Sequence, residues 1–143
     1  MAVASILAQK GREVVTAPPD RSLQDVATIL AERKIGAIVI TDNSGRVLGM
    51  LSERDIVRAM AREGASALDD PVSRHMTQRV VTTTEEATIP DTMEQMTAGR
   101  FRHLPVIAND RLVGMISIGD IVKWRLAEIE SEHQALREYI ATA

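Results

Sequence analysis

The strongest constraint on what this chain can fold into is an internal repeat. Residues 14–58 align with residues 80–123 with a single gap, at Gly45. The best-matched segments are R-V-L-G-M-L-S-E-R-D-I-V and R-L-V-G-M-I-S-I-G-D-I-V, and both copies begin with V-V-T. A duplicated segment of this kind marks a duplicated structural unit. The 143 residues are therefore expected to form one globule made of two related halves.

Each copy shows the same order of local signals. A short β-branched run comes first, at 14–16 and 80–82, and a helix follows whose start has the S/T-x-x-D capping pattern. Two apolar runs separated by a short polar turn then predict a β-hairpin. A second helix is expected to open at Ser52 or Ser117. The predicted fold class is α/β (α+β), with two β-α-β-β-α repeats packed about a pseudo-twofold axis.

The repeats set the expected domain organisation. Repeat one covers residues 5–62, a small and polar linker covers 63–71, repeat two covers 72–124, and a C-terminal helical extension covers 125–143. Apolar residues recur every three or four positions near the C-terminus, so the helix has an apolar seam longer than its own half can cover. This seam either meets a partner surface or folds back on its own chain. The seam residues are Val122, Leu126, Ile129, His133, Leu136 and Ile140.

Composition and charge exclude several classes of function. Aromatic residues make up 2% of the chain, so no ladder of stacking rings exists for single-stranded nucleic acid. The net charge is -3, which argues against a broad phosphate-binding surface, and we expect no nucleic-acid partner. The chain has no cysteine, and His75, His103 and His133 lie far apart in sequence, so neither a disulfide nor a metal site is expected.

The N-terminus gives no sign of export. It lacks a basic segment before its short apolar stretch, and nowhere do about 18 apolar residues follow one another. We therefore expect a cytoplasmic protein that does not contact a membrane.

Three motifs together resemble a known family. The doubled β-α-β-β-α order, the twice-occurring G-h-h-S-x-x-D-I-V (h apolar) and the R-H-L-P-V run at 102–106 are similar to a tandem pair of cystathionine-β-synthase-type (CBS) domains, over residues 5–124. The resemblance implies a non-enzymatic regulatory module that binds an adenine nucleotide, AMP, ATP/ADP or NAD(H), in the cleft between the repeats. It also implies no required cofactor, a homodimer, and a regulated protein partner to which the ligand state is signalled.

The strand-to-helix turns at Ser52 and Ser117 are the candidate ligand sites. In each turn the serine is followed three residues later by an aspartate, Asp55 or Asp120, which predicts a helix cap. The same turn also offers exposed N–H groups, a hydroxyl and a carboxylate, which suit a phosphate and a ribose. By the resemblance, the aspartate holds the ribose and the serine hydroxyl lies near the phosphate or the ribose.

The adenine base and the phosphates need further contacts. The base requires an apolar slot with main-chain partners, and Gly36 leaves room for a close backbone approach, although small strand residues are equally typical of core packing. The phosphates require cations, although scattered basic residues are often simply solvated. The resemblance and the charges together indicate nucleotide contacts, besides the two turns, at Thr16, Ala17, Lys34, Gly36, Ala37, Arg54, Thr82, Arg100, Arg102, His103, Leu104, Pro105 and Ile118.

The two clefts are not expected to be equivalent, because Val39 stands where copy two has Pro105. We expect Asp120→Ala to weaken nucleotide binding, and Asp55→Ala to do less if only the Asp120 cleft is occupied. Arg54 is then expected to reach a phosphate whose ribose lies on Asp120.

Three classes of function fit these patterns. The first is an adenine-nucleotide sensor, the second is a structural dimerisation or protein-interaction module without ligand, and the third is a phosphate-transferring or hydrolytic enzyme. His103 is the candidate general base, but no serine or threonine nucleophile with a paired carboxylate can be argued from spacing. We therefore expect no catalytic residue.

Overall fold

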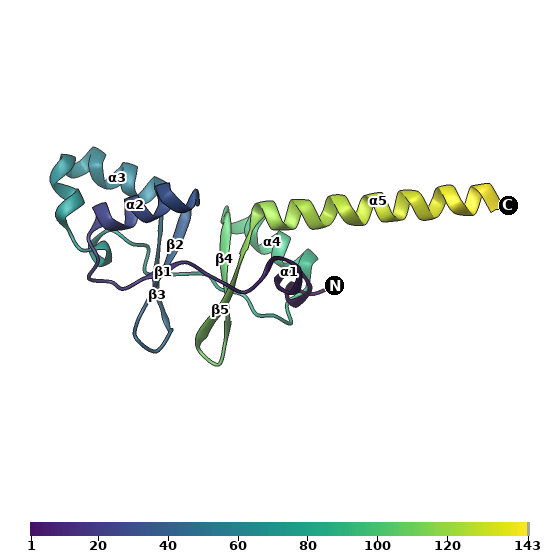
Figure 1. Ribbon diagram of the computed structural model, residues 1–143, viewed down its shortest axis with the longest axis horizontal. Helices are drawn as coiled ribbons and strands as arrows, with labels where there is room; N and C mark the ends of the chain where they lie inside the picture. The colour runs from purple at the N-terminus through teal and green to yellow at the C-terminus, as the bar shows by residue number, and fades with distance from the viewer. Residues whose placement is uncertain (143) are drawn as a thin grey trace.

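The computed structural model describes residues 1–142, and its two halves lie side by side with their hairpins pointing the same way (Figure 1). The mixed α+β fold class and the C-terminal helix are confirmed. The elements are α1 (Val3–Lys10), β1 (Thr16–Ala17), α2 (Leu23–Arg33), β2 (Ala37–Thr41), β3 (Val47–Ser52), α3 (Glu53–Glu63), the short 3₁₀ helices η1 (Gly64–Asp69) and η2 (Val72–Arg74), α4 (Ile89–Gly99), β4 (His103–Ala108), β5 (Arg111–Ser117) and α5 (Ile118–Thr142).

The first half contains a three-stranded sheet in the order β1-β2-β3. β1 runs parallel to β2, and β2 pairs antiparallel with β3 across the predicted polar turn. In that turn Oδ1 of Asp42 accepts hydrogen bonds from the backbone N–H groups of Ser44 (2.8 Å) and Arg46 (3.0 Å). Gly45 has a φ of 84°, a conformation that favours glycine. The hairpin therefore lies where the sequence predicts it.

The helices that cover the sheets begin at the predicted caps. The Ser22 hydroxyl accepts from the N–H of Asp25 (3.0 Å) before α2, and the Thr88 hydroxyl accepts from the N–H of Asp91 (3.1 Å) before α4. Each cap satisfies an N–H group that the helix itself leaves unpaired, and such a cap stabilises a helix by about 0.5–2 kcal/mol. The buried apolar faces behind these caps comprise Leu23, Val26 and Leu30 of α2, and Ile89 and Met96 of α4.

The second half has a two-stranded sheet, so the first strand predicted at 80–82 is wrong. The chain makes a single parallel bridge instead: Thr83 donates to the carbonyl of Pro105 (2.9 Å) and accepts from the N–H of Ile107 (3.0 Å). The next bond of this ladder would need an N–H at Pro105, and proline has none. Copy one has Val39 at that position, and there the strand forms.

The N-terminal helix α1, which the sequence patterns do not indicate, packs on the second half. It buries Val3, Ile6 and Leu7 in the second-half core, and the side chain of Leu7 lies where a Cβ on Gly114 would come within 2.8 Å. An ion pair between Arg12 and Glu85 (2.5 Å) fastens the end of the helix to the same half. The chain then crosses to β1 in the first half (Figure 1).

The segment at 72–77, just before the second aligned copy at 80–123, makes the reciprocal crossing. Val72 is buried in the first-half core and Met76 packs against it. Met50 of β3 and Thr77 exchange two backbone hydrogen bonds of 3.0 and 2.9 Å. A Cβ on Gly49 would lie 2.5 Å from Sδ of Met76 and 2.9 Å from the carbonyl oxygen of Thr77. Each half is therefore completed by the segment that lies just before the aligned copy of the other half.

The segment predicted as a linker, 63–71, contains the 3₁₀ helix η1. Its η1 turn packs against α3 and α2, and Ala67 is fully buried in the first-half core. The backbone N–H of Leu23 also donates to the carbonyl of Asp70 (2.9 Å). The connection therefore forms part of the first half.

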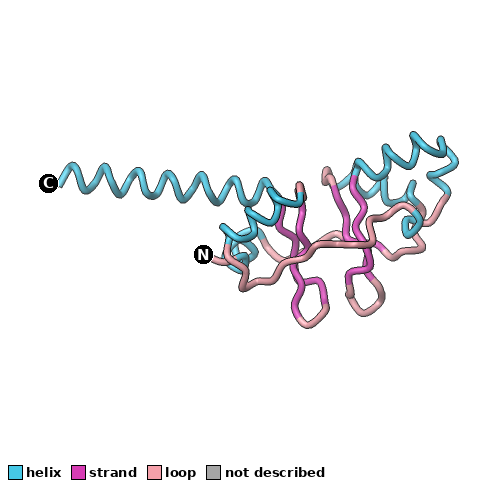
Figure 2. The backbone as a smooth tube through the Cα atoms, turned by 180° about the vertical axis from the view of Figure 1, so that it is seen from behind, coloured by secondary structure: helices cyan, strands magenta, loops and turns pink. Residues whose placement is uncertain are grey.

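The C-terminal helix α5 extends away from both halves (Figures 1 and 2). Its seam is exposed: Leu126, Ile129, Leu136 and Ile140 keep 57%, 44%, 57% and 66% of their surface. The alternative that the helix folds back on its own chain is therefore wrong. Within residues 1–142, no helix is both long and apolar enough to cross a membrane.

Candidate functional site

The turn between β3 and α3 is held by a reciprocal cap. The hydroxyl of Ser52 accepts from the N–H of Asp55 (3.3 Å), and Oδ2 of Asp55 accepts from the N–H of Ser52 (2.9 Å) and from its hydroxyl (3.1 Å). The cap fixes the carboxylate of Asp55 at the start of the helix, where the helix dipole favours negative charge.

The equivalent turn between β5 and α5 has the same core geometry. The N–H of Ser117 donates to Oδ2 of Asp120 (2.8 Å), and the N–H of Asp120 donates to the hydroxyl of Ser117 (3.1 Å). The capping prediction is therefore confirmed at both turns.

A cleft of about 700 Å³ lies between the two halves, beside the first of these turns. β2, β3 and α3 line it from the first half, and the segments at 77–81 and 99–103 line it from the second. Eight of the residues expected to contact nucleotide are brought together there: Gly36, Ala37, Ser52, Arg54, Asp55, Arg100, Arg102 and His103.

The cleft is rich in unpaired positive charge. Five arginines line it, against two carboxylates, those of Glu53 and Asp55. Among residues 1–142, none of the five guanidinium groups makes an ion pair or a side-chain hydrogen bond; the pairs formed by arginine elsewhere involve other positions. An excess of positive charge in a partly enclosed cleft attracts anions. The arginines are Arg54, Arg58, Arg79, Arg100 and Arg102.

Two of these arginines were not among the residues expected to contact nucleotide. Arg58 lies one turn after Arg54 on α3, and the four-residue spacing that places both on one helix face is the signal that could have found it. Arg79 enters the cleft only because the segment at 72–77 crosses over β3. Nothing local in the sequence indicates that crossing.

His103 lies at the edge of the cleft, 4.0 Å from the position of a Cβ on Gly36. Burial is the largest cause that lowers the pKa of its imidazole, and the charge of Lys10 acts in the same direction, while Asp120 opposes it. The ring is therefore held in its neutral form, and it can donate and accept hydrogen bonds without adding charge.

The other residues expected to contact nucleotide lie outside this lining. Ala17 and Leu104 are buried in the two cores, and Lys34 is the exposed residue that ends α2 with a φ of 55°. Thr82 lines a smaller cavity of about 360 Å³. The remaining residues of this group are Thr16, Pro105, Ser117, Ile118 and Asp120.

Asp120 differs from Asp55 because it has a cationic partner. Nζ of Lys10, from α1, lies 2.6 Å from Oδ2 of Asp120 and 2.9 Å from the carbonyl oxygen of Met115. Burial acts to raise the pKa of the Asp120 carboxyl, but the hydrogen bonds from Lys10 and Ser117 outweigh it, so the pKa lies below its usual value. Lys10 is a residue that the sequence patterns do not single out.

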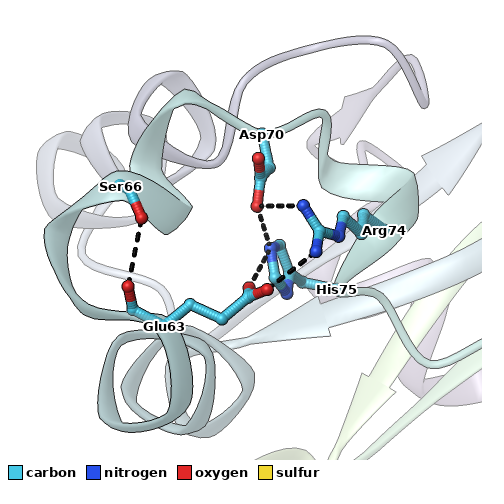
Figure 3. Close-up of polar contacts among 5 residues, drawn as sticks. All are labelled: Glu63, Ser66, Asp70, Arg74 and His75. Carbon is cyan, nitrogen blue, oxygen red and sulfur yellow. Dashed lines mark hydrogen bonds and ion pairs between the residues drawn. The ribbon is translucent and has the colours of Figure 1, made fainter.

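A second polar cluster lies at the end of α3, around His75 (Figure 3). Nε2 of His75 lies 2.8 Å from Oδ2 of Asp70 and 3.4 Å from Oε2 of Glu63, and the ring is 3% exposed. These three side chains could offer metal ligands within 4.8 Å of one another. However, the guanidinium of Arg74 already pairs with both carboxylates, at 2.8 and 3.2 Å. The ion pairs of this cluster thus connect η1 and η2 to α3.

Comparisons with known proteins agree with the duplicated fold. A family model for the CBS domain matches residues 5–62 and 72–127. The crystal structure of a CBS-domain containing protein from Agrobacterium tumefaciens is 50% identical, with a TM-score of 0.84 over 87% of this chain and 99% of that one. A CBS domain protein from Pyrobaculum aerophilum complexed with AMP is 28% identical, with a TM-score of 0.73 over 84% of this chain and 89% of that one.

The two curated relatives described next are longer than this chain. An uncharacterized 17.7 kDa protein from Acidianus ambivalens is 34% identical over 112 residues, which are 78% of this chain and 66% of that relative. The match to another curated relative covers 61% of its length. The chain therefore spans about two thirds or less of the relatives that match it first.

Proposed function

Because this chain belongs to the CBS domain family, with a matching domain in each half, we propose that it is a non-enzymatic regulatory module that binds an adenosine nucleotide in the cleft beside Asp55. The observation that carries the proposal is the set of five unpaired arginines around a carboxylate held at a helix start. Ribose hydroxyls donate hydrogen bonds, which a carboxylate accepts. Phosphate oxygens accept hydrogen bonds, and a guanidinium group can donate two of them in parallel.

The positive charge of the cleft favours ligands that carry phosphate. The arginines favour AMP, ADP, ATP or NAD(H), because each carries phosphate, over S-adenosylmethionine, whose sulfonium is positive. The AMP complex of the Pyrobaculum aerophilum relative supports the same class. The volume of about 700 Å³ lies within the ordinary range of small-molecule sites.

The position of the cleft supports a regulatory role. Its lining comes from both halves, so a ligand that binds Asp55 and Arg102 together stabilises one arrangement of the two halves relative to others. A regulated protein partner that contacts both halves would then sense whether nucleotide is bound. No cofactor is needed for this role.

The exposed seam of α5 supports a homodimer as the assembled form. Four apolar residues along one helix, each between 44% and 66% exposed, would each contribute up to about 1.5–3 kcal/mol if covered. A second copy offers the same seam, which would make the interface symmetric. The competing role is a structural dimerisation module whose clefts stay empty.

Titration calorimetry separates these functions. The purified chain is titrated with AMP, ADP, ATP, NADH and S-adenosylmethionine, and the phosphate-bearing ligands should bind with saturation while S-adenosylmethionine binds least. The absence of binding across the panel would favour the scaffold, and turnover of any ligand would favour an enzyme.

A matched pair of variants locates the binding. Arg102→Ala removes a guanidinium from the cleft and should weaken ATP binding by about tenfold or more, the usual loss for a hydrogen bond between charged groups. Arg137→Ala, on the projecting part of α5, is the control and should leave the affinity unchanged. Equal effects of the two variants would place the ligand elsewhere.

A further inference from the structure

The two halves present equivalent carboxylates in different charge environments. Asp55 and Asp120 occupy the same position in the two repeats, and each caps its helix through the preceding serine. Among residues 1–142, Asp55 makes no ion pair, whereas Asp120 is paired with Lys10. The difference lies outside the repeat motifs, because Lys10 precedes the aligned segments.

Lys10 is well held at this position. Its ammonium bonds both Asp120 (2.6 Å) and the carbonyl of Met115 (2.9 Å), so two of its three N–H donors are used. The helix that carries it is anchored by Leu7 against Gly114. The ammonium is therefore placed by buried packing as well as by charge.

The first half has an equivalent position without this ion pair. Met76 packs on Gly49 as Leu7 packs on Gly114, and three residues beyond each lie Arg79 and Lys10. Arg79 lines the open cleft and makes no ion pair among residues 1–142. Lys10 is thus paired with Asp120 in the second half. Arg79 instead lines the cleft that also contains Asp55, and within residues 1–142 neither of these two makes an ion pair.

We propose that Lys10 closes the Asp120 position to ligand, so that each chain takes one adenosine nucleotide, at Asp55. This inference rests on the proposed function and specifies which of the two equivalent positions works. A ribose hydroxyl at Asp120 would have to compete with an ammonium that already neutralises the carboxylate. At Asp55, within residues 1–142, no ion pair has to be displaced before the carboxylate accepts it.

The number of sites tests this proposal. Lys10→Met leaves an unbranched side chain one heavy atom shorter and removes the charge, and Arg137→Met, on the projecting part of α5, is the control. Calorimetry with ADP should give one site per chain for the wild type and the control, and a second site for Lys10→Met. Adding Asp120→Asn to Lys10→Met should remove the second site again.

A second measurement does not depend on how Lys10→Met folds. In the wild-type background, Asp120→Asn should change the affinity for ADP by less than twofold, while Asp55→Asn should lower it by tenfold or more. One site in both the wild type and Lys10→Met, or a loss of affinity in Asp120→Asn, would overturn the role of Lys10 and leave the proposed function standing. Absence of ADP binding in every variant and in the wild type would refute the proposed function and the inference with it.

Discussion

At the scale of single residues, the caps are the part of the site that local sequence determines. Ser52 and Asp55 are three residues apart, so their reciprocal hydrogen bonds follow from the start of the helix alone. Lys10 and Asp120 are 110 residues apart. Their pairing depends on the docking of α1 on the second half, which no spacing rule describes, so Lys10 could not be predicted from the sequence.

The half-buried His103 predicts a dependence of stability on pH. Its pKa is lowered in the folded chain, so the unfolded chain binds the proton more tightly, and stability should rise with pH up to about 6.5, the ordinary value for histidine. His103→Gln keeps a neutral polar side chain and lacks this titration. Urea unfolding between pH 5 and 8 should therefore show the wild type gaining stability relative to His103→Gln as the pH rises to that value. A constant difference between the two proteins would mean that burial does not shift the histidine.

At the scale of elements, the order of strands and helices follows from the repeated patterns, and the exceptions have local causes. Pro105 cannot donate to the next bond of its ladder, so the strand predicted at 80–82 is reduced to one bridge. α1 is too short to show a clear period, and it is held in place by Leu7 and its neighbours in the second-half core. The proline is visible in the sequence, but the strand register is needed to tell which backbone hydrogen bond it removes.

A substitution at Gly49 tests the crossing of the segment at 72–77 over β3. A methyl group there would meet Sδ of Met76 at 2.5 Å and the backbone carbonyl of Thr77 at 2.9 Å, so the backbone itself has to shift. Gly49→Ala should lower the free energy of unfolding by about 1–3 kcal/mol, the usual cost of overpacking. The control is Gly114→Ala, whose three nearest atoms all belong to the side chain of Leu7 rather than to the backbone, and which should cost less. Urea denaturation of both variants measures this, and equal losses would contradict the account of the crossing.

At the scale of the whole molecule, the net charge does not indicate the local cluster of arginines. The chain carries 17 basic and 20 acidic residues, which argued against a phosphate-binding surface. The fold nevertheless gathers five arginines in one cleft between the halves. Their positions come from both repeats and from the crossing segment, so the composition of the chain could not indicate that they meet.

The projecting helix α5 tests the proposed assembly. Removing residues 126–143 deletes most of the exposed seam and leaves both halves and the cleft intact. Multi-angle light scattering should show a dimer for the full chain and a monomer for the truncated one, because the seam supplies the apolar area of the interface. A dimer in both proteins would assign the interface to the two halves, and a monomeric full chain would contradict the proposed homodimer.

We expect a nucleotide to bind between the halves with its ribose on Asp55 and its phosphates on the arginines. A crystal structure of the full chain grown with ADP tests it most directly. We predict one ADP per chain, with ribose hydroxyls within hydrogen-bond distance of the Asp55 carboxylate and phosphate oxygens on Arg100 and Arg102. An ADP bound at Asp120 with Lys10 displaced, or a cleft without nucleotide at saturating ADP, would contradict the account.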